Sequence, residues 1–167
     1  EYRGYDSVGM CFINGSGIDI KKGVGKLHEV NSRINFLRMP GKVGLGHCRW
    51  STHGGVTEEN AHPHVDCTSK ISVVHNGIIE NYSELKEELA GKGHKFYSET
   101  DTEVLAHLIE KFFTGNLEKA VRKALGLVKG TYGLAVVAKQ DPAKLVAAKN
   151  SSPLLIGVGE QENLVAS

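Results

Sequence analysis

The order of its periodic segments limits the folds open to this chain of 167 residues. Alternating or β-branched runs predict strands at residues 8–13, 18–21, 43–48, 71–74, 94–98, 132–138, 145–148, 154–158 and 164–166. Apolar residues at helical spacing predict helices at 24–37, 82–90 and 117–128, and a fourth behind a capping box at residues 100–103. Strands come first, helices gather in the middle, and strands return. This order favours an α+β fold with largely antiparallel sheets over alternating βαβ units.

Composition and charge narrow the classes of function. The hydrophobic content of 40% and charged content of 23% are typical of one globular domain, and the net charge of +1 gives no basis for binding nucleic acid or a membrane surface. No apolar run approaches transmembrane length. The chain has three cysteines, an odd number, and two of them lie next to strand-like apolar residues. We interpret them as reduced thiols of a cytoplasmic protein.

The segment from residue 71 to 81, ISVVHNGIIEN, joins a β-prone run to the dipeptide Asn76-Gly77. Asn-Gly favours positive φ, so one interpretation is a tight turn at the end of a buried strand. The alternative is that the Asn76 amide and the Gly77 N–H are two fixed hydrogen-bond donors. Such a pair forms an oxyanion hole if a nucleophile lies opposite. The dipeptide alone is compatible with both interpretations.

Two charged residues are candidates for recognising an amino acid. Arg49 follows a β-prone run, and its planar guanidinium suits bidentate capture of a carboxylate, although a surface ion pair would explain it equally well. Asp101 opens a predicted helix, where the dipole favours an acid whether or not that acid receives an ammonium group. Together with Asn76 and Gly77, these side chains would complement a zwitterionic amino acid that carries a reactive carbonyl.

Phosphate and metal sites have weaker support. The glycine pairs near residues 15, 23 and 44 lack a Walker lysine or a complete dinucleotide pattern, so we interpret them as turn glycines. Histidines and cysteines gather between residues 47 and 67, but their spacing fits no closed zinc pattern and Arg49 lies among them. The residues considered were His47, Cys48, His53, His62, His64 and Cys67. The sequence therefore predicts no metal and no cofactor.

Five motifs, taken in order, resemble a known family. They are EYRGYDS at residues 1–7, GHCRWSTHG at 46–54, NAHPH at 60–64, HNGIIENY at 75–82 and SETDTE at 98–103. They closely resemble the glutaminase domain of the glutamine–fructose-6-phosphate aminotransferases, which are class II glutamine amidotransferases and N-terminal nucleophile hydrolases. The resemblance covers essentially the whole chain. Trp50 and residues 78–81 favour this family over amidophosphoribosyltransferases and asparagine synthetases.

The resemblance implies a fold and a set of roles. The fold is a four-layer α/β/β/α sandwich with two largely antiparallel sheets. The oxyanion hole falls to Asn76 and Gly77. Glutamine binding falls to five residues: Arg49 at the α-carboxylate, Asp101 at the α-ammonium, Thr52 and His53 along the pocket, and Trp50 on the loop that closes it.

The resemblance also implies an activity, namely hydrolysis of the glutamine amide to supply ammonia for converting fructose-6-phosphate to glucosamine-6-phosphate. The family's nucleophile is an N-terminal cysteine on a short strand ahead of the segment that matches Glu1, with its own α-amine as base. We therefore expect residues 1–167 to be a type 2 amidotransferase domain without that strand and without the following sugar-isomerase domains. Fructose-6-phosphate would bind on those domains, and the full-length protein would be a homo-oligomer.

Two alternatives stay open at this stage. The first is another class II amidotransferase or a stand-alone glutaminase, and the second is a catalytically inactive domain that binds glutamine. None of Cys11, Cys48 and Cys67 takes the terminal position of the family's nucleophile. The polypeptide of residues 1–167 is therefore expected to have no glutaminase activity alone.

Overall fold

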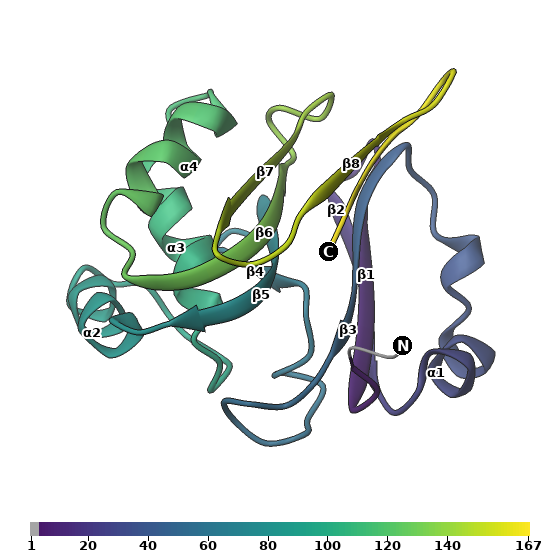
Figure 1. Ribbon diagram of the computed structural model, residues 1–167, viewed down its shortest axis with the longest axis horizontal. Helices are drawn as coiled ribbons and strands as arrows, with labels where there is room; N and C mark the ends of the chain where they lie inside the picture. The colour runs from purple at the N-terminus through teal and green to yellow at the C-terminus, as the bar shows by residue number, and fades with distance from the viewer. Residues whose placement is uncertain (1–3) are drawn as a thin grey trace.

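The computed structural model describes residues 4–167, which form two antiparallel sheets packed face to face (Figure 1). The first sheet has the order β2-β1-β3 and comprises β1 (Ser7–Ile13), β2 (Ile18–Val24) and β3 (Val43–Arg49). The second has the order β4-β5-β6-β7 and comprises β4 (His64–Val65), β5 (Ile71–Ile79), β6 (Gly130–Ala138) and β7 (Leu145–Asn150). A hairpin of β8 (Leu155–Val158) and β9 (Asn163–Ala166) follows. The start of the first motif, residues 1–3, lies outside the described residues.

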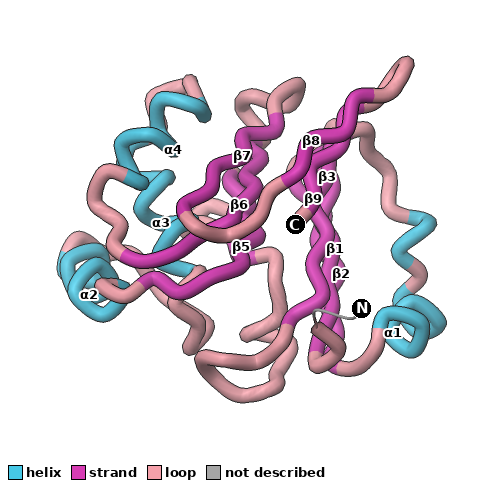
Figure 2. Tube along the Cα trace, viewed as in Figure 1, coloured by secondary structure: helices cyan, strands magenta, loops and turns pink. Residues whose placement is uncertain are grey.

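Helices cover the outer faces of the two sheets (Figure 2). Helix α1 (Leu27–Ile34) and the 3₁₀ turn η1 (Phe36–Arg38) lie beside the first sheet. Helices α2 (Tyr82–Gly91), α3 (Glu103–Phe112) and α4 (Leu117–Leu125) lie beside the second. The layers therefore run α/β/β/α, which confirms the predicted class and layer order. Within residues 4–167, no helix combines the length and apolar character needed to cross a bilayer.

The alternation of side chains along β1 produces the middle of the sandwich. Val8 and Phe12 face α1 and pack around Val30, whereas Cys11 and Ile13 face the second sheet and pack with residues of β3 and β6. Successive residues of a strand point to opposite faces, so one seven-residue strand contributes to two cores. A third and larger core lies between the second sheet and helices α2–α4, and α3 is buried from its first residue through Ile109.

Three local predictions were wrong. Asn76 and Gly77 lie inside β5, paired with Gly133 and Tyr132 of β6, rather than in a turn after the strand. Residues 94–98 form no strand. The predicted helix at 24–37 ends at Ile34, because Asn35 adopts a left-handed conformation with φ of 51°.

The predicted capping box at residues 100–103 is also absent. Helix α3 begins at Glu103, and the Thr100 hydroxyl contacts Ser98 Oγ and His64 Nε2 instead of the helix. The Glu103 carboxylate accepts hydrogen bonds from the backbone N–H groups of Tyr97 and Ser98. The same bonds explain why residues 94–98 are not a strand, because a side chain takes the donors that a neighbouring strand would need.

Candidate active site

A cavity of about 160 Å³ lies where the loop after β3, the strand β5 and the segment before α3 meet. It is smaller than the roughly 300 Å³ at the lower end of sites for drug-sized ligands, and so suits a small metabolite. All seven residues predicted to act on glutamine line it: Arg49, Trp50, Thr52, His53, Asn76, Gly77 and Asp101. Sequence neighbours do not explain this grouping, because the seven come from three separate segments. Their predicted roles are not tested by their position alone.

Gly77 shapes the floor of the cavity on β5. Its φ of +134° lies in the region that favours glycine, and a Cβ at this position would lie 2.1 Å from the carbonyl oxygen of Thr131. Strand β6 therefore approaches Gly77 too closely for any side chain. The glycine keeps β5 paired with β6 through the Asn76-Gly77 dipeptide, where the sequence alone suggested a turn.

The Asn76 side chain is held from one side by a histidine that the sequence analysis did not place in the glutamine site. Asn76 Oδ1 lies 2.8 Å from His47 Nε2 on β3 and accepts its hydrogen, so the amide nitrogen points away from His47. That nitrogen donates to Ser167 Oγ at 2.6 Å. An amide fixed in this way presents a donor without having to reorient, which is the property that an oxyanion hole requires.

Burial keeps His47 in the neutral form. Desolvation lowers its pKa from 6.5 to about 4, and the hydrogen bond to Asn76 opposes the shift only in part. The ring stacks on His62 with 4.2 Å between centroids. Burial also lowers the pKa of His62, well below its usual value, and lowers the pKa of His64 to about 3. Three of the four histidines considered as metal ligands, His47, His62 and His64, thus form a buried, uncharged wall behind the cavity.

Arg49 has an exposed fraction of 4% and organises the loop that follows it. Its guanidinium donates to the carbonyl oxygens of His53, Gly54 and Gly55, with 3.1 Å from Nη1 to the Gly55 oxygen. Burial lowers the pKa of Arg49, while Asp6, Asp101 and Glu99 act in the opposite direction. In this arrangement, Arg49 shapes the loop and at the same time gives one wall of the cavity its positive charge.

Two further residues that the sequence analysis did not single out hold the same loop. The Asn60 Nδ2 donates to the Gly55 carbonyl and to Glu99 Oε2, at 3.0 and 3.1 Å. The Glu99 N–H donates back to Asn60 Oδ1 at 2.9 Å. Both belong to motifs of the resemblance, NAHPH and SETDTE, but no local pattern predicts a contact across 39 residues. Trp50 is 54% exposed and packs edge-on against Tyr5, at the mouth of this region.

Asp101 also lines the cavity, in the short segment that enters α3. Its Oδ2 accepts the backbone N–H of Ile79 at 2.8 Å, which ties the acid to the end of β5, and its exposed fraction is 5%. The hydroxyl of Thr102 lies between Asp101 Oδ1 and His75 Nδ1, at 3.4 and 2.8 Å. The cavity therefore carries a fixed positive group and a fixed negative group, as a zwitterionic ligand requires.

A second cavity, of about 290 Å³, adjoins the first and shares His47, His75 and Asn76 with it. Cys48 and Ser167 line this larger cavity, so the donor nitrogen of Asn76 points toward its side. The other two cysteines lie elsewhere. Cys11 is buried between the sheets with its thiol 3.3 Å from Ser72 Oγ, and Cys67 lies in the turn that precedes β5.

A family of glutamine amidotransferase domains matches residues 47–167, which include the whole lining of the smaller cavity and all of the larger one except Gly4 and Gly46. The chain belongs to this family. Over its whole length, the amidotransferase domain is 53% identical to the glutamine–fructose-6-phosphate aminotransferase (isomerizing) of Thermococcus kodakarensis and 54% identical to that of Pyrococcus horikoshii. The corresponding enzyme of Clostridium tetani is 48% identical. The chain spans 28% of the length of each of these relatives.

Solved structures share the fold. The glutamine phosphoribosylpyrophosphate amidotransferase from B. subtilis, in complex with ADP and GMP, superimposes with a TM-score of 0.84 at 27% identity. A structure described as the allosteric regulatory enzyme of purine biosynthesis gives the same TM-score at 29% identity. Each comparison covers 98% of the amidotransferase domain and 36% of the other chain. Family membership and fold are thereby confirmed, while the roles of individual site residues remain predictions.

Proposed function

We propose that this domain hydrolyses the side-chain amide of glutamine within a glutamine–fructose-6-phosphate aminotransferase. The observation that carries the proposal is the single cavity in which Arg49 and Asp101 face the Asn76-Gly77 strand segment. A positive group, a negative group and an amide donor match the carboxylate, ammonium and side-chain carbonyl of glutamine. The identities of 46–54% with these aminotransferases, against 27–29% with the purine enzymes, support fructose-6-phosphate as the acceptor in the whole protein.

The two charged side chains fix the backbone end of glutamine. Asp101 keeps its Oδ2 on the Ile79 N–H and its Oδ1 3.4 Å from the Thr102 hydroxyl, which leaves the remaining lone pairs of the carboxylate for an ammonium group. Arg49 has five N–H donors, and those on Nη1 and Nη2 serve the carbonyls of residues 53–55. Carboxylate capture therefore uses the remaining guanidinium hydrogens, or replaces one loop carbonyl. Thr52 and His53 line the adjoining wall.

The side chain of glutamine then extends toward the junction of the two cavities. There the Asn76 Nδ2 donates to the carbonyl oxygen of the amide, together with the Gly77 N–H. Both donors stabilise the negative charge that develops when a thiolate attacks the amide carbon. The His47 hydrogen bond keeps the Asn76 amide in this orientation, so His47 is a positioning residue. The exposed Trp50 moves over the mouth and keeps the released ammonia from water.

The attacking thiol comes, by resemblance, from a terminal cysteine ahead of the segment that matches Glu1. The α-amine of such a residue has an unperturbed pKa of about 7.7–8.0, so it serves as base without help from a histidine. The buried histidines of this site agree with that division of roles, because burial lowers the pKa of each of His47, His62 and His75 and leaves them uncharged.

The aminotransferase as a whole would be a cytoplasmic homo-oligomer that passes ammonia to fructose-6-phosphate on other domains.

The test uses the whole natural protein that contains this chain. Glutamine and fructose-6-phosphate together should yield glutamate and glucosamine-6-phosphate in equal amounts, whereas phosphoribosyl pyrophosphate should yield no amine product. Asp101→Asn should abolish most of the glutamine-dependent activity and leave the activity with added ammonium chloride unchanged. Glutamine hydrolysis coupled to a different acceptor would refute the assignment, and so would full glutamine-dependent activity in Asp101→Asn.

A further inference from the structure

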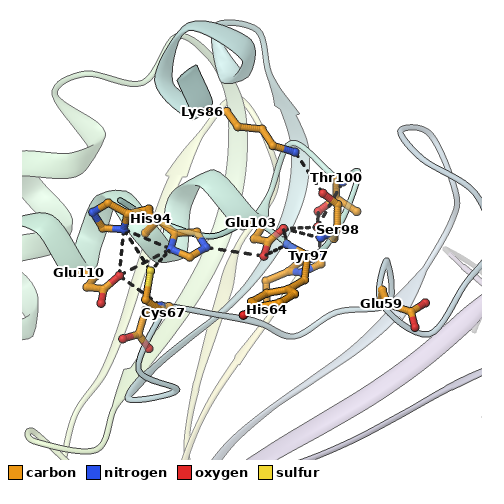
Figure 3. Close-up of polar contacts among 12 residues, drawn as sticks. Glu59, His64, Cys67, Lys86, His94, Tyr97, Ser98, Thr100, Glu103 and Glu110 are labelled. Carbon is orange, nitrogen blue, oxygen red and sulfur yellow. Dashed lines mark hydrogen bonds and ion pairs between the residues drawn. The ribbon is translucent and has the colours of Figure 1, made fainter. Parts of the chain in front are cut away.

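Four side chains with metal-binding atoms lie together, and none of them belongs to the lining of either cavity; Figure 3 labels three of them, Cys67, His94 and Glu110. Cys67 lies in the turn between β4 and β5, and His94 lies in the loop that follows α2. His107 and Glu110 lie one turn apart on α3, so they occupy one face of the helix. The sequence analysis considered Cys67 but not the other three.

Five of the six distances among these atoms are close to those of a tetrahedral ion site, and all six lie within 4.8 Å. Cys67 Sγ lies 3.4 Å from His94 Nδ1 and 3.3 Å from His107 Nδ1, and the two nitrogens are 3.4 Å apart. Glu110 Oε2 lies 3.1 Å from His94 Nδ1 and 3.6 Å from His107 Nδ1. Four ligands about 2.0–2.3 Å from a central zinc ion lie roughly 3.3–3.8 Å from one another at tetrahedral corners.

The surroundings of the His107 ring support a ligand role. Its exposed fraction is 1%, and its Nε2 has no hydrogen bond but lies 3.6 Å from Glu103 Oε1. In the tautomer with its proton on Nε2, that proton would face the Glu103 carboxylate and the Nδ1 lone pair would point to the cluster. A carboxylate behind the second nitrogen is the usual arrangement around a metal-bound histidine, because it fixes the tautomer and the ring orientation.

The turn that carries Cys67 is held by hydrogen bonds that do not involve an ion. Asp66 Oδ1 accepts the N–H groups of Lys70 and Ile71, each at 2.6 Å, and Oδ2 accepts the Thr68 N–H at 3.1 Å. The N–H of Cys67 itself donates to Glu110 Oε2 at 3.2 Å. A ligand set held in place by other bonds loses little conformational entropy on binding. Cys67 is also exposed, which gives an ion access to the cluster.

We propose that Cys67, His94, His107 and Glu110 bind one zinc ion. A thiolate and two imidazoles favour zinc over calcium or magnesium, which take oxygen ligands. The thiolate and the carboxylate together balance the charge of Zn²⁺. Four protein ligands close the coordination shell, so the ion is structural: it joins the β4–β5 turn, the loop after α2 and helix α3. Because Glu103 links the start of α3 to Tyr97 and Ser98, the same ion braces the segment that carries Asp101.

The test is metal binding by the whole natural protein, purified without a histidine tag and compared with variants. Wild type should hold one equivalent of zinc more per chain than Cys67→Ser. After removal of metal by a chelator under reducing conditions, Co²⁺ should give the visible absorption of a tetrahedral ion and a thiolate-to-cobalt charge-transfer band. Both signals should disappear in Cys67→Ser and on addition of zinc. Readdition of zinc should raise the Tm of wild type by several degrees.

Matched variants separate a site from nonspecific binding. His94→Gln and Glu110→Gln should each weaken zinc binding at least tenfold, whereas His28→Gln, at an exposed histidine of α1, should leave it unchanged. Cys67 and Glu110 are not deeply buried, so Cys67→Ser and Glu110→Gln should fold even if a variant at the buried His107 does not. Equal zinc content in wild type and Cys67→Ser would overturn the proposal, as would a Co²⁺ spectrum without a thiolate band.

Discussion

A single amide side chain carries the oxyanion assignment at the level of residues. In the whole natural protein, Asn76→Ala should lower glutaminase turnover by roughly a hundred-fold or more, because the lost donor acts when negative charge develops. The affinity for glutamine should change much less. Steady-state kinetics and direct titration with glutamine measure the two quantities separately. Asn163→Ala, at an exposed asparagine of β9, is the matched control. Normal turnover with poor binding would make Asn76 a ground-state contact.

The assignment of Arg49 needs a test that separates two roles, because its guanidinium also holds the carbonyls of residues 53–55. Arg49→Lys keeps the charge and loses the planar fork, so glutamine binding should weaken by about 2–5 kcal/mol. The α-amide of glutamine lacks the carboxylate. If Arg49 binds that group, wild type should prefer glutamine to its α-amide and the variant should lose the preference.

Calorimetric titration of both ligands gives the answer, and Arg38→Lys, at an exposed arginine, serves as control. An equal loss of affinity for both ligands would assign Arg49 to the loop alone. That outcome would leave the positive group for the glutamine carboxylate unidentified.

At the level of elements, the buried histidines of β3, β5 and the segment at 62–64 should make stability depend on pH. Burial lowers the pKa of His47 to about 4 and that of His64 to about 3, against 6.5 in the unfolded chain. Between these values the unfolded state binds more protons, so the free energy of unfolding falls as pH falls from about 6.5. The contribution of His47 alone is about 3 kcal/mol, present above pH 6.5 and lost by about pH 4.

Urea unfolding at pH 7.5, 6.5, 5.5 and 4.5 measures this effect. His47→Gln keeps an N–H donor for Asn76 but does not titrate, so it should reduce the dependence between pH 6.5 and 4.5 by the share of His47, while the other buried histidines keep theirs. His28→Gln, which changes an exposed histidine, should leave the dependence as in wild type. Stability that is constant over this window would contradict the buried, neutral state of the histidines.

Some features of the helices and strands were predictable from the sequence, and others were not. Alternation along β1 and helical spacing in α2, α3 and α4 were sufficient for these elements and for the α+β class, because each pattern acts through its nearest neighbours. The order of the layers came from the resemblance. The course of β5 through Gly77 was not predictable, since it depends on the approach of Thr131 from β6. Residues 94–98 have a strand-like pattern, but the Glu103 carboxylate takes two of their backbone donors.

The residues of the candidate site were likewise predictable only in part. The resemblance placed seven residues at the site, and they line one cavity. The residues that support them were missed. His47 reaches Asn76 across 29 positions, and Asn60 reaches Glu99 across 39, so no local period links them. The proposed zinc ligands have the same character, because only His107 and Glu110 share an element.

At the level of the whole molecule, the position of the cysteines leads to the last prediction. Cys11 is buried between the sheets, and Cys67 lies in the turn before β5 outside both cavities, so neither can attack glutamine at Asn76. Cys48 lines the larger cavity beside Asn76 and is the one internal thiol of residues 4–167 near the donors. The resemblance instead assigns attack to a terminal cysteine, which supplies thiol and base from one residue.

The polypeptide of residues 1–167, made with Glu1 as its first residue, should therefore release no ammonia from glutamine above the residual rate that donors and binding groups give alone. The natural protein should release ammonia at working rates, and Cys48→Ala in that protein should preserve them. Ammonia release by the three proteins, at equal concentrations and with folding checked by circular dichroism, decides between the two thiols. Comparable rates for the 1–167 polypeptide and the natural protein, abolished by Cys48→Ala, would refute a terminal nucleophile and make Cys48 the attacking group.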